Sequence, residues 1–322
     1  MGERDPRLEQ MLPNEHLSFS GHETFVFRHS WLKKAVDCVA EDPEVFTKED
    51  AIVRLGVGKN MVRSIRHWGL ATGVLAEEAK SRGAKLRVSD FGQILLGPAG
   101  YDQYLEDPNT LWLLHWRILS QTQRCTAWHW VFNRFPASEF TRAVLTQFVL
   151  DEARRLNPSA SNENSIRRDV DVLLRTYVAS TDSKASVGED TFDCPLSELG
   201  LIEARLSSDL FQIQRGPKPS LSDLAFAFAL CEFWDGLPTL QQTLAFSEIA
   251  YRSGGPGVVF RLDENSIAER LERLEMLTAG KLVYTETAGL RQVYRNASVS
   301  PADLLDEHYQ TSGELLDVEV LG

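Results

Sequence analysis

Apolar residues recur every three or four positions along most of this chain, which is the pattern of amphipathic helices. The clearest case lies in residues 54–69. There a turn precedes a helix that we predict to begin at the N-cap Asn60 and to end at Gly69. Glycines at positions 56 and 58 allow the turn to be tight. The apolar stripe of this predicted helix consists of Met61, Ile65 and Trp68.

The opposite side of the same predicted helix is basic and polar. No acidic residue occurs between Leu55 and Ala76. A helix with such a face suits the major groove of DNA, and an ordinary solvated helix face is the alternative interpretation. The residues that we expect to contact DNA from this helix are Lys59, Asn60, Arg63, Arg66 and His67.

A β-hairpin is predicted directly after this helix. Two short stretches, 70–75 and 85–88, enclose a polar tip. Lys85 and Arg87 belong to the second stretch, and we expect them to contact phosphates, which position a protein on DNA without reading its sequence. Turn, helix and hairpin together predict a winged-helix DNA-binding domain in residues 18–100.

The rest of the chain predicts helices and one further hairpin. Residues 101–219 predict a helical middle domain with an acidic loop, and residues 220–297 predict a second winged-helix-like unit. A flexible lead-in (1–17) and an acidic tail (298–322) complete the chain. The predicted fold class is therefore mainly α with small β-hairpin wings, with two winged-helix-like units flanking a helical middle.

Aromatic residues are concentrated in the predicted middle domain. Aromatic side chains can stack on nucleic-acid bases, but at this density inside apolar helices they are more typical of a core. We therefore expect burial of Trp112, Trp116, Trp128, Trp130 and Phe132.

Charge is distributed unevenly over the 322 residues, whose net charge is −12. Residues 54–87 hold 8 basic and 2 acidic residues, which gives +6, whereas residues 220–322 hold 7 basic and 16 acidic residues, which gives −9. A basic island on an acidic chain indicates one confined face for a polyanion. The acidic C-terminal third favours a solvated surface or a basic protein partner.

Two further features of composition narrow the class of protein. No apolar run is long enough to cross a membrane, and the charged N-terminus lacks the apolar region of a secretory signal. The cysteines are far apart and form no C-x-x-C pair, so we expect buried thiols in a cytoplasmic protein rather than a zinc site. The four are Cys38, Cys125, Cys194 and Cys231.

A glycine followed by adjacent histidine and glutamate is unusual in a plain core segment. Here His22 and Glu23 follow such a glycine, and Arg28 lies close by in sequence. One interpretation makes the three residues catalytic, as a general acid/base or metal-binding pair with an arginine for phosphate. The other interpretation is a polar cluster that bonds this loop to the next helix, and the residue types alone favour it, because no second ligand follows at the spacing of a metal motif.

Carboxylates in three segments could hold Mg²⁺, which prefers oxygen ligands. Asp169 and Asp171 are two apart on a predicted helix, so they do not share a face. A surface acidic turn is the commoner explanation for the third group. The metal-ligand candidates are Glu23, Asp169, Asp171, Glu189, Asp190 and Asp193.

Several segments together resemble a known bacterial family of unknown-function-domain proteins that accompanies DNA phosphorothioation genes. The resemblance covers roughly residues 18–297. The segments that carry it are Ser20-Gly-His-Glu-Thr-Phe25 with Trp31-Leu-Lys-Lys34, Leu55-Gly-Val-Gly-Lys-Asn-Met-Val-Arg63, residues 193–202 and Thr287-Ala-Gly-Leu-Arg-Gln-Val-Tyr294.

The resemblance implies a DNA-nicking protein that uses Mg²⁺ and serves antiphage defence. It also implies partners: double-stranded DNA, a cysteine desulfurase, an ATPase and a PAPS-reductase-like sulfur-transfer enzyme. The sequence nevertheless shows no familiar nuclease signature. Two hypotheses therefore stay open: a Mg²⁺-dependent DNA nickase, and a non-catalytic DNA-binding adaptor that recruits sulfur-transfer partners. A transcription regulator is a weaker third hypothesis.

Overall fold

The structure, a computed structural model, describes residues 17–157, 162–179, 194–205, 209–238 and 241–320. The predicted lead-in lies almost wholly outside these residues, as do three of the predicted metal ligands, Glu189, Asp190 and Asp193. The described chain is mainly helical with small antiparallel sheets, as predicted. None of its helices combines the length and the apolar character that crossing a membrane requires.

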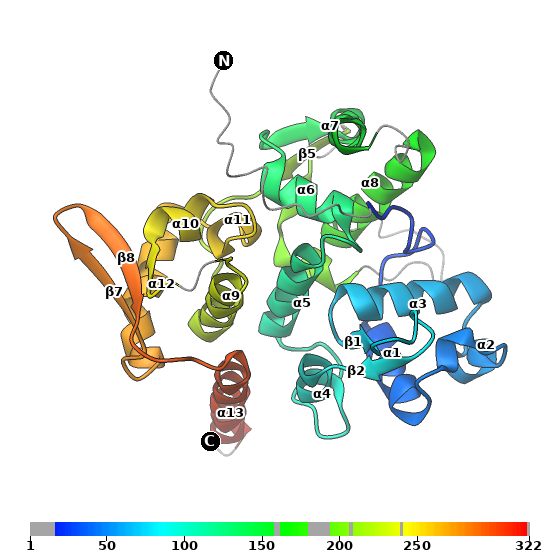
Figure 1. Cartoon of the computed structure of the whole chain (residues 1–322), viewed down its shortest axis with the longest axis horizontal. Helices are drawn as coiled ribbons and strands as arrows, with labels where there is room; N and C mark the ends of the chain where they lie inside the picture. Colours follow the sequence, from blue (N-terminus) through cyan, green and yellow to red (C-terminus); the bar gives the residue numbers. More distant parts are fainter. Residues whose placement is uncertain (1–16, 158–161, 180–193, 206–208, 239–240, 321–322) are drawn as a thin grey trace.

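The N-terminal segment packs three helices and a two-stranded hairpin around one apolar core (Figure 1). The hairpin was predicted, and a fourth helix follows it, capped by the hydroxyl of Ser89, which accepts a hydrogen bond from the Gly92 amide at 2.9 Å. The elements are α1 (His29–Glu41), η2 (Val45–Thr47), α2 (Ala51–Leu55), α3 (Lys59–Ala71), β1 (Leu75–Glu77), β2 (Leu86–Val88) and α4 (Asp90–Leu96).

Both predicted ends of α3 are wrong. Its N-cap is Gly58, and Asn60 lies inside the first turn. The helix continues past Gly69 to Ala71, because Gly69 is buried where α3 meets the hairpin. A Cβ at Gly69 would lie 2.7 Å from the Cδ1 of Leu75, so this glycine permits close packing rather than ending the helix.

The middle segment contains a three-stranded antiparallel sheet that the sequence did not predict. Its strand order is β3-β5-β4. The helix that follows strand β3 begins at Arg142, after the N-cap Thr141. The elements are α5 (Pro108–Ser120), α6 (Thr126–Arg134), β3 (Glu139–Thr141), α7 (Arg142–Leu156), α8 (Glu163–Tyr177), η5 (Pro195–Leu199), β4 (Ile202–Ala204) and β5 (Leu210–Ile213).

The C-terminal segment combines helices with a second three-stranded sheet, of order β6-β8-β7. Part of the predicted acidic tail is a helix, α13, which packs on α9 (Figure 1). The elements are α9 (Asp223–Asp235), β6 (Thr243–Ala245), α10 (Phe246–Tyr251), α11 (Pro256–Val259), α12 (Glu264–Leu277), β7 (Leu282–Thr287), β8 (Leu290–Arg295) and α13 (Pro301–Val320).

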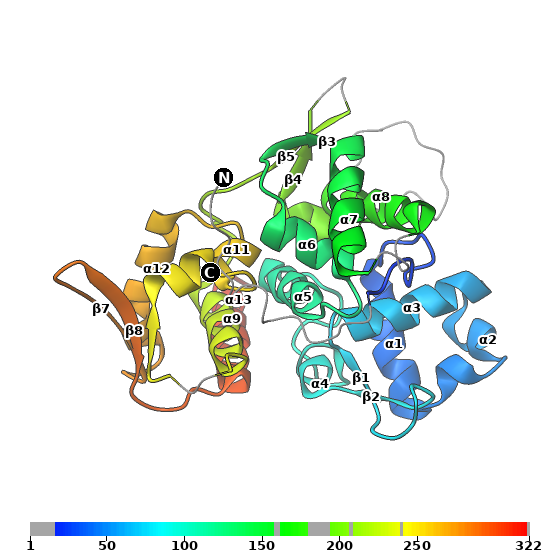
Figure 2. The ribbon, with the colours of Figure 1, turned by 45° about the horizontal axis from the view of Figure 1, so that its top comes forward.

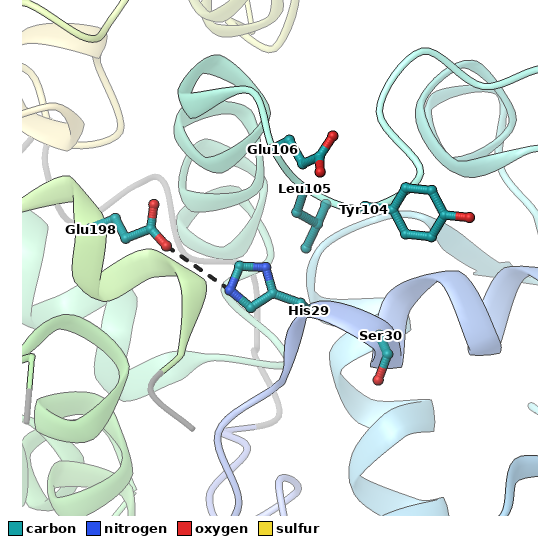
Figure 3. A pocket seen from close by; sticks show the side chains of 6 residues that line it. All are labelled: His29, Ser30, Tyr104, Leu105, Glu106 and Glu198. Atoms are coloured by element: carbon teal, nitrogen blue, oxygen red, sulfur yellow. Dashed lines mark ion pairs between the residues drawn. The ribbon is translucent and has the colours of Figure 1, made fainter. Parts of the chain in front are cut away.

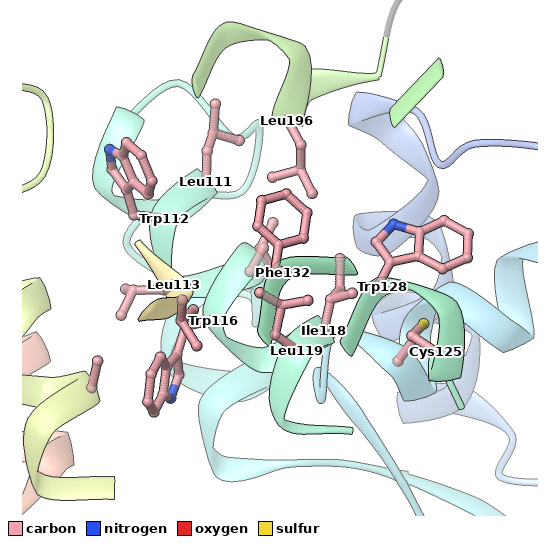
Figure 4. Close-up of a cluster of buried hydrophobic side chains, with 14 of the residues drawn as sticks. Leu111, Trp112, Leu113, Trp116, Ile118, Leu119, Cys125, Trp128, Phe132 and Leu196 are labelled. Atoms are coloured by element: carbon pink, nitrogen blue, oxygen red, sulfur yellow. The ribbon is translucent and has the colours of Figure 1, made fainter. Parts of the chain in front are cut away.

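The aromatic residues of the middle segment form the core, as predicted (Figure 4). Helix α5 is central, since it packs on α6, α9 and η5. The indole N–H groups of Trp112 and Trp116 donate to Ser220 Oγ at 3.1 Å and Glu232 Oε2 at 2.9 Å. None of the predicted core aromatics is more than 2% exposed, so the base-stacking alternative is wrong for Trp112, Trp116, Trp128, Trp130 and Phe132.

Candidate nucleic-acid and metal site

Helix α3 presents Lys59, Asn60 and Arg63 to solvent. Val62, Ile65 and Trp68 pack inward instead. No described residue forms an ion pair with Lys59, so its ammonium is available to a ligand. The outward side of α3 therefore has the charge that a phosphate backbone requires.

Two of the predicted DNA-contacting residues on α3, Arg66 and His67, are not exposed. Arg66 is half-buried: its guanidinium donates to the carbonyl of Gly83 at 2.9 Å and lies 3.6 Å from Glu77, so it attaches the hairpin tip to the helix. The prediction that His67 faces outward is wrong, because its side chain is only 9% exposed. Burial lowers the pKa of His67 to about 3, which keeps the ring neutral.

The hairpin carries the remaining predicted DNA contacts on strand β2 and just before it. Arg87 is exposed, and Lys85 lies 3.5 Å from Glu44, with which it forms an exposed ion pair. Such a pair contributes little to stability and can be exchanged for a phosphate.

A short segment, residues 18–25, lies between α3 and α8 in both views of the molecule (Figures 1 and 2), and we call it the strap. The Trp68 indole of α3 donates to the carbonyl of Phe25 at 2.9 Å, and the Arg175 guanidinium of α8 donates to the carbonyl of Thr24 at 2.6 Å. Three of its non-glycine residues have positive φ, namely Ser20 (64°), Glu23 (49°) and Thr24 (69°). Such strain persists only where surrounding contacts hold it.

A buried pair between His22 and Asp169 of α8 also holds the strap. Nε2 of His22 lies 3.1 Å from Oδ1 of Asp169, and both side chains are almost fully buried. Since Nδ1 accepts a hydrogen bond from the Thr24 amide at 3.1 Å, Nε2 carries the proton and donates it to the carboxylate. The Ser20 amide donates to the same oxygen at 2.6 Å. Burial raises the pKa of Asp169, and these donors oppose that rise.

The three predicted catalytic residues do not share one environment. His22 is enclosed, which supports the interpretation as a polar anchor, although it bonds the strap to α8 rather than to the next helix. Glu23 is accessible, and its carboxylate lies 3.3 Å from the Arg63 guanidinium of α3. Arg28 is the N-cap of α1, with its guanidinium 5.3 Å from the centre of the Trp31 ring.

The predicted metal ligands that the structure describes do not converge either. Asp169 faces His22 in the interior, whereas Asp171, two residues further along α8, pairs with Arg142 at the start of α7. Within the described ranges, no group of three or more histidine, cysteine, aspartate or glutamate side chains could hold a metal ion.

A surface pocket that the sequence did not indicate lies at the start of α1 (Figure 3). Its volume is about 540 Å³. Nε2 of His29 lies 4.0 Å from a carboxylate oxygen of Glu198, and both side chains are exposed. These residues are distant in sequence, so no local pattern could have revealed the pocket. Its lining consists of His29, Ser30, Tyr104, Leu105, Glu106 and Glu198.

Comparison with known proteins confirms the predicted resemblance to a family of unknown-function-domain proteins. It resembles two crystal structures of SspB. One, with bound magnesium ion, is 33% identical with a TM-score of 0.84, over 95% of this chain and 91% of that chain. The other is 32% identical with a TM-score of 0.81, over 92% of this chain and 89% of that chain. No curated protein matches. The model of a protein family of unknown function, DUF4007, matches residues 19–309, and the chain belongs to that family.

Proposed function

We propose that this chain binds double-stranded DNA through α3 and the β1–β2 hairpin, as a component of a bacterial DNA phosphorothioation system that serves antiphage defence. The outward face of α3, with Lys59 and Arg63 and no acidic residue anywhere on the helix, is the observation that carries the proposal. The order of α1, α2, α3 and the hairpin supports a winged-helix arrangement in which α3 enters the major groove and the hairpin contacts phosphates.

The place in a phosphorothioation system rests on the likeness to SspB along almost the whole chain. The partners proposed on this basis are a cysteine desulfurase, an ATPase and a PAPS-reductase-like sulfur-transfer enzyme, in the cytoplasm. The C-terminal third, with net charge −9, offers a surface for a basic protein partner.

Binding is tested with a fluorescently labelled duplex and the variants Lys59→Ala and Arg63→Ala. Each variant should bind more weakly, and the salt dependence of log K should flatten by about 1 for each lost phosphate contact. Lys281→Ala, an exposed change of the same charge in the C-terminal segment, is the control. Unchanged affinity in both α3 variants would overturn the proposal.

Mg²⁺-dependent nicking of the bound DNA is a second candidate function, favoured by the magnesium-bound SspB structure. Glu23 is an accessible carboxylate beside Arg63 of the proposed DNA-binding face, so it is the ligand that we would change first. The alternative is a non-catalytic DNA-binding adaptor, which would recruit sulfur-transfer partners through its acidic C-terminal third.

Supercoiled plasmid separates the two candidates. A nickase should convert it to open circles with Mg²⁺ and not with EDTA. Glu23→Gln should abolish this conversion, whereas Glu269→Gln on the exposed side of α12 should leave it intact. No open-circle product at any protein concentration, together with intact DNA binding, would establish the adaptor.

A further inference from the structure

The middle and C-terminal segments repeat one arrangement of elements. In the middle segment the order is α6, β3, α7, α8 with the short η5, β4, β5, and in the C-terminal segment it is α9, β6, α10 with the short α11, α12, β7, β8. Both sheets are antiparallel, and in both the last strand lies between the other two. Helices α8 and α12 therefore occupy the same place in two copies of one unit.

The amino-acid sequence repeats at the start of these two helices. Asn162-Glu-Asn-Ser-Ile166 and Asp263-Glu-Asn-Ser-Ile267 differ only in the capping residue. In each, the cap side chain accepts a hydrogen bond from the backbone amide of the serine, at 3.3 Å and 2.9 Å, and the isoleucine is fully buried.

Helix α3 begins in a similar way. Its N-cap Gly58 is followed two residues later by Asn60 and four residues later by the buried Val62. The same asparagine and the same buried aliphatic position occur at the start of α8 and α12. The three helices therefore share the asparagine and the buried aliphatic residue of the first turn, although the cap Gly58 of α3 has no side chain to accept a hydrogen bond. Among them, α3 is the one proposed to enter DNA.

Only one of the other two has a surface that suits a polyanion. Helix α12 exposes Glu269, Glu272 and Glu275, which would repel phosphates. Helix α8 instead exposes Arg167, Arg168 and Arg175. Arg168 forms no ion pair with any residue in the described part of the chain, so its guanidinium is available to a ligand.

The strap lies between α8 and α3 (Figure 2). Arg175 contacts the strap at the carbonyl of Thr24, and Arg63 of α3 contacts it at Glu23, the adjacent residue. Arg168 lies seven residues before Arg175, which is two helical turns, so both project from the same side of α8. The cations of the two helices thus flank one short segment of backbone.

We propose that α8 is a second DNA-contacting helix, in which Arg168 and Arg175 bind phosphates of the same duplex that α3 holds. The strap and the carboxylate of Glu23 then face the DNA backbone between the two helices. This inference rests on the proposed DNA binding by α3 and extends it to the middle segment. Arginine is suited to this contact because its planar guanidinium can donate two hydrogen bonds to one phosphate.

The test compares Arg168→Ala with Arg168→Lys in the full chain, on a labelled duplex over a range of salt concentrations. Arg168→Ala should weaken binding and flatten the salt dependence of log K by about 1, and the double variant with Lys59→Ala should flatten it by about 2. Arg168→Lys should retain the salt dependence, since it keeps the charge. Thermal unfolding checks that each variant is folded, and Lys281→Ala is the charge-matched control.

The outcomes distinguish DNA contact by α8 from DNA binding through α3, on which it rests. If Lys59→Ala weakens binding and Arg168→Ala does not, α8 does not contact DNA while the role of α3 stands. If neither variant differs from the control, DNA binding through α3 fails as well. Hydroxyl-radical footprinting gives a second readout: Arg168→Ala should remove protection at one end of the protected segment, and an unchanged footprint contradicts the inference.

Discussion

The nickase and the adaptor hypotheses assign different roles to Glu23. Its backbone φ of 49° is held by the buried contact between its neighbour His22 and Asp169, so its carboxylate has a defined place beside Arg63. If DNA binds across the strap, this negative charge lies close to phosphates. Either a cation bound by the Glu23 carboxylate neutralises this charge, or the charge opposes DNA binding.

Glu23→Gln should therefore raise DNA affinity in EDTA, because it removes a charge that repels phosphate and occupies Arg63. For an exposed charge the gain should be on the order of two- to fivefold, which corresponds to about 0.4–1 kcal/mol. Equilibrium binding at low salt measures it, with Glu269→Gln as the matched control. Weaker binding by Glu23→Gln in EDTA would show that the carboxylate does not oppose phosphate.

Helix α5 holds the elements of the middle and C-terminal segments together through His115. Its Nδ1 lies 2.8 Å from the Tyr177 hydroxyl at the end of α8, and its Nε2 lies 3.0 Å from the carbonyl of Val259 in α11. Since a carbonyl can only accept, Nε2 carries the proton and Nδ1 accepts from the tyrosine. The ring is fully buried, and burial lowers its pKa to about 3.

This depressed pKa predicts a loss of stability in acid. Below pH 6.5 the unfolded chain protonates His115 while the folded protein keeps it neutral until about pH 3. The free energy of unfolding should fall by up to about 1.4 kcal/mol per pH unit in that window on account of this residue. In His115→Gln this contribution is absent, so the stability difference from wild type should narrow by roughly 2 kcal/mol between pH 7.5 and pH 5.

Urea unfolding of both proteins at the two pH values measures this difference. His67, whose pKa burial also lowers to about 3, is present in both proteins, so its contribution cancels. A difference that stays constant with pH would contradict the assignment of a neutral buried His115.

At the scale of the whole molecule, the charges are segregated along the fold. Residues 54–87 carry +6 and include α3 and the hairpin, whereas residues 220–322 carry −9 and include α12 and α13. Since an acidic protein repels DNA over most of its surface, contact should be confined to the faces of α3, the hairpin and α8.

This confinement predicts a moderate salt dependence of DNA binding. Six cations are proposed to contact phosphates: Lys59, Arg63, Lys85, Arg87, Arg168 and Arg175. The slope of log K against log salt should then be roughly −5 to −6, at about −0.9 for each phosphate contact. Titrations between roughly 50 and 200 mM salt measure this slope. A slope near zero would show that charge does not drive the association.

Local sequence determined much of this molecule. The helical period identified α3 and its buried Ile65 and Trp68, and the hairpin after α3 was predicted. These features depend on residues within a turn or two of one another, so the chain specifies them without distant partners. The basic character of the outward face of α3 follows from the same period.

Only the tertiary structure decided which polar groups are enclosed. His67 was assigned to the solvent side of α3, but it is buried, because the strap closes over it: a Cβ at Gly21 would lie 2.6 Å from its Nδ1. His22 and Asp169 meet across 147 residues of chain, and the sheet of the middle segment pairs β3 with β5 across more than 60. Such contacts arise from packing between segments distant in sequence, and no spacing along the chain encodes them.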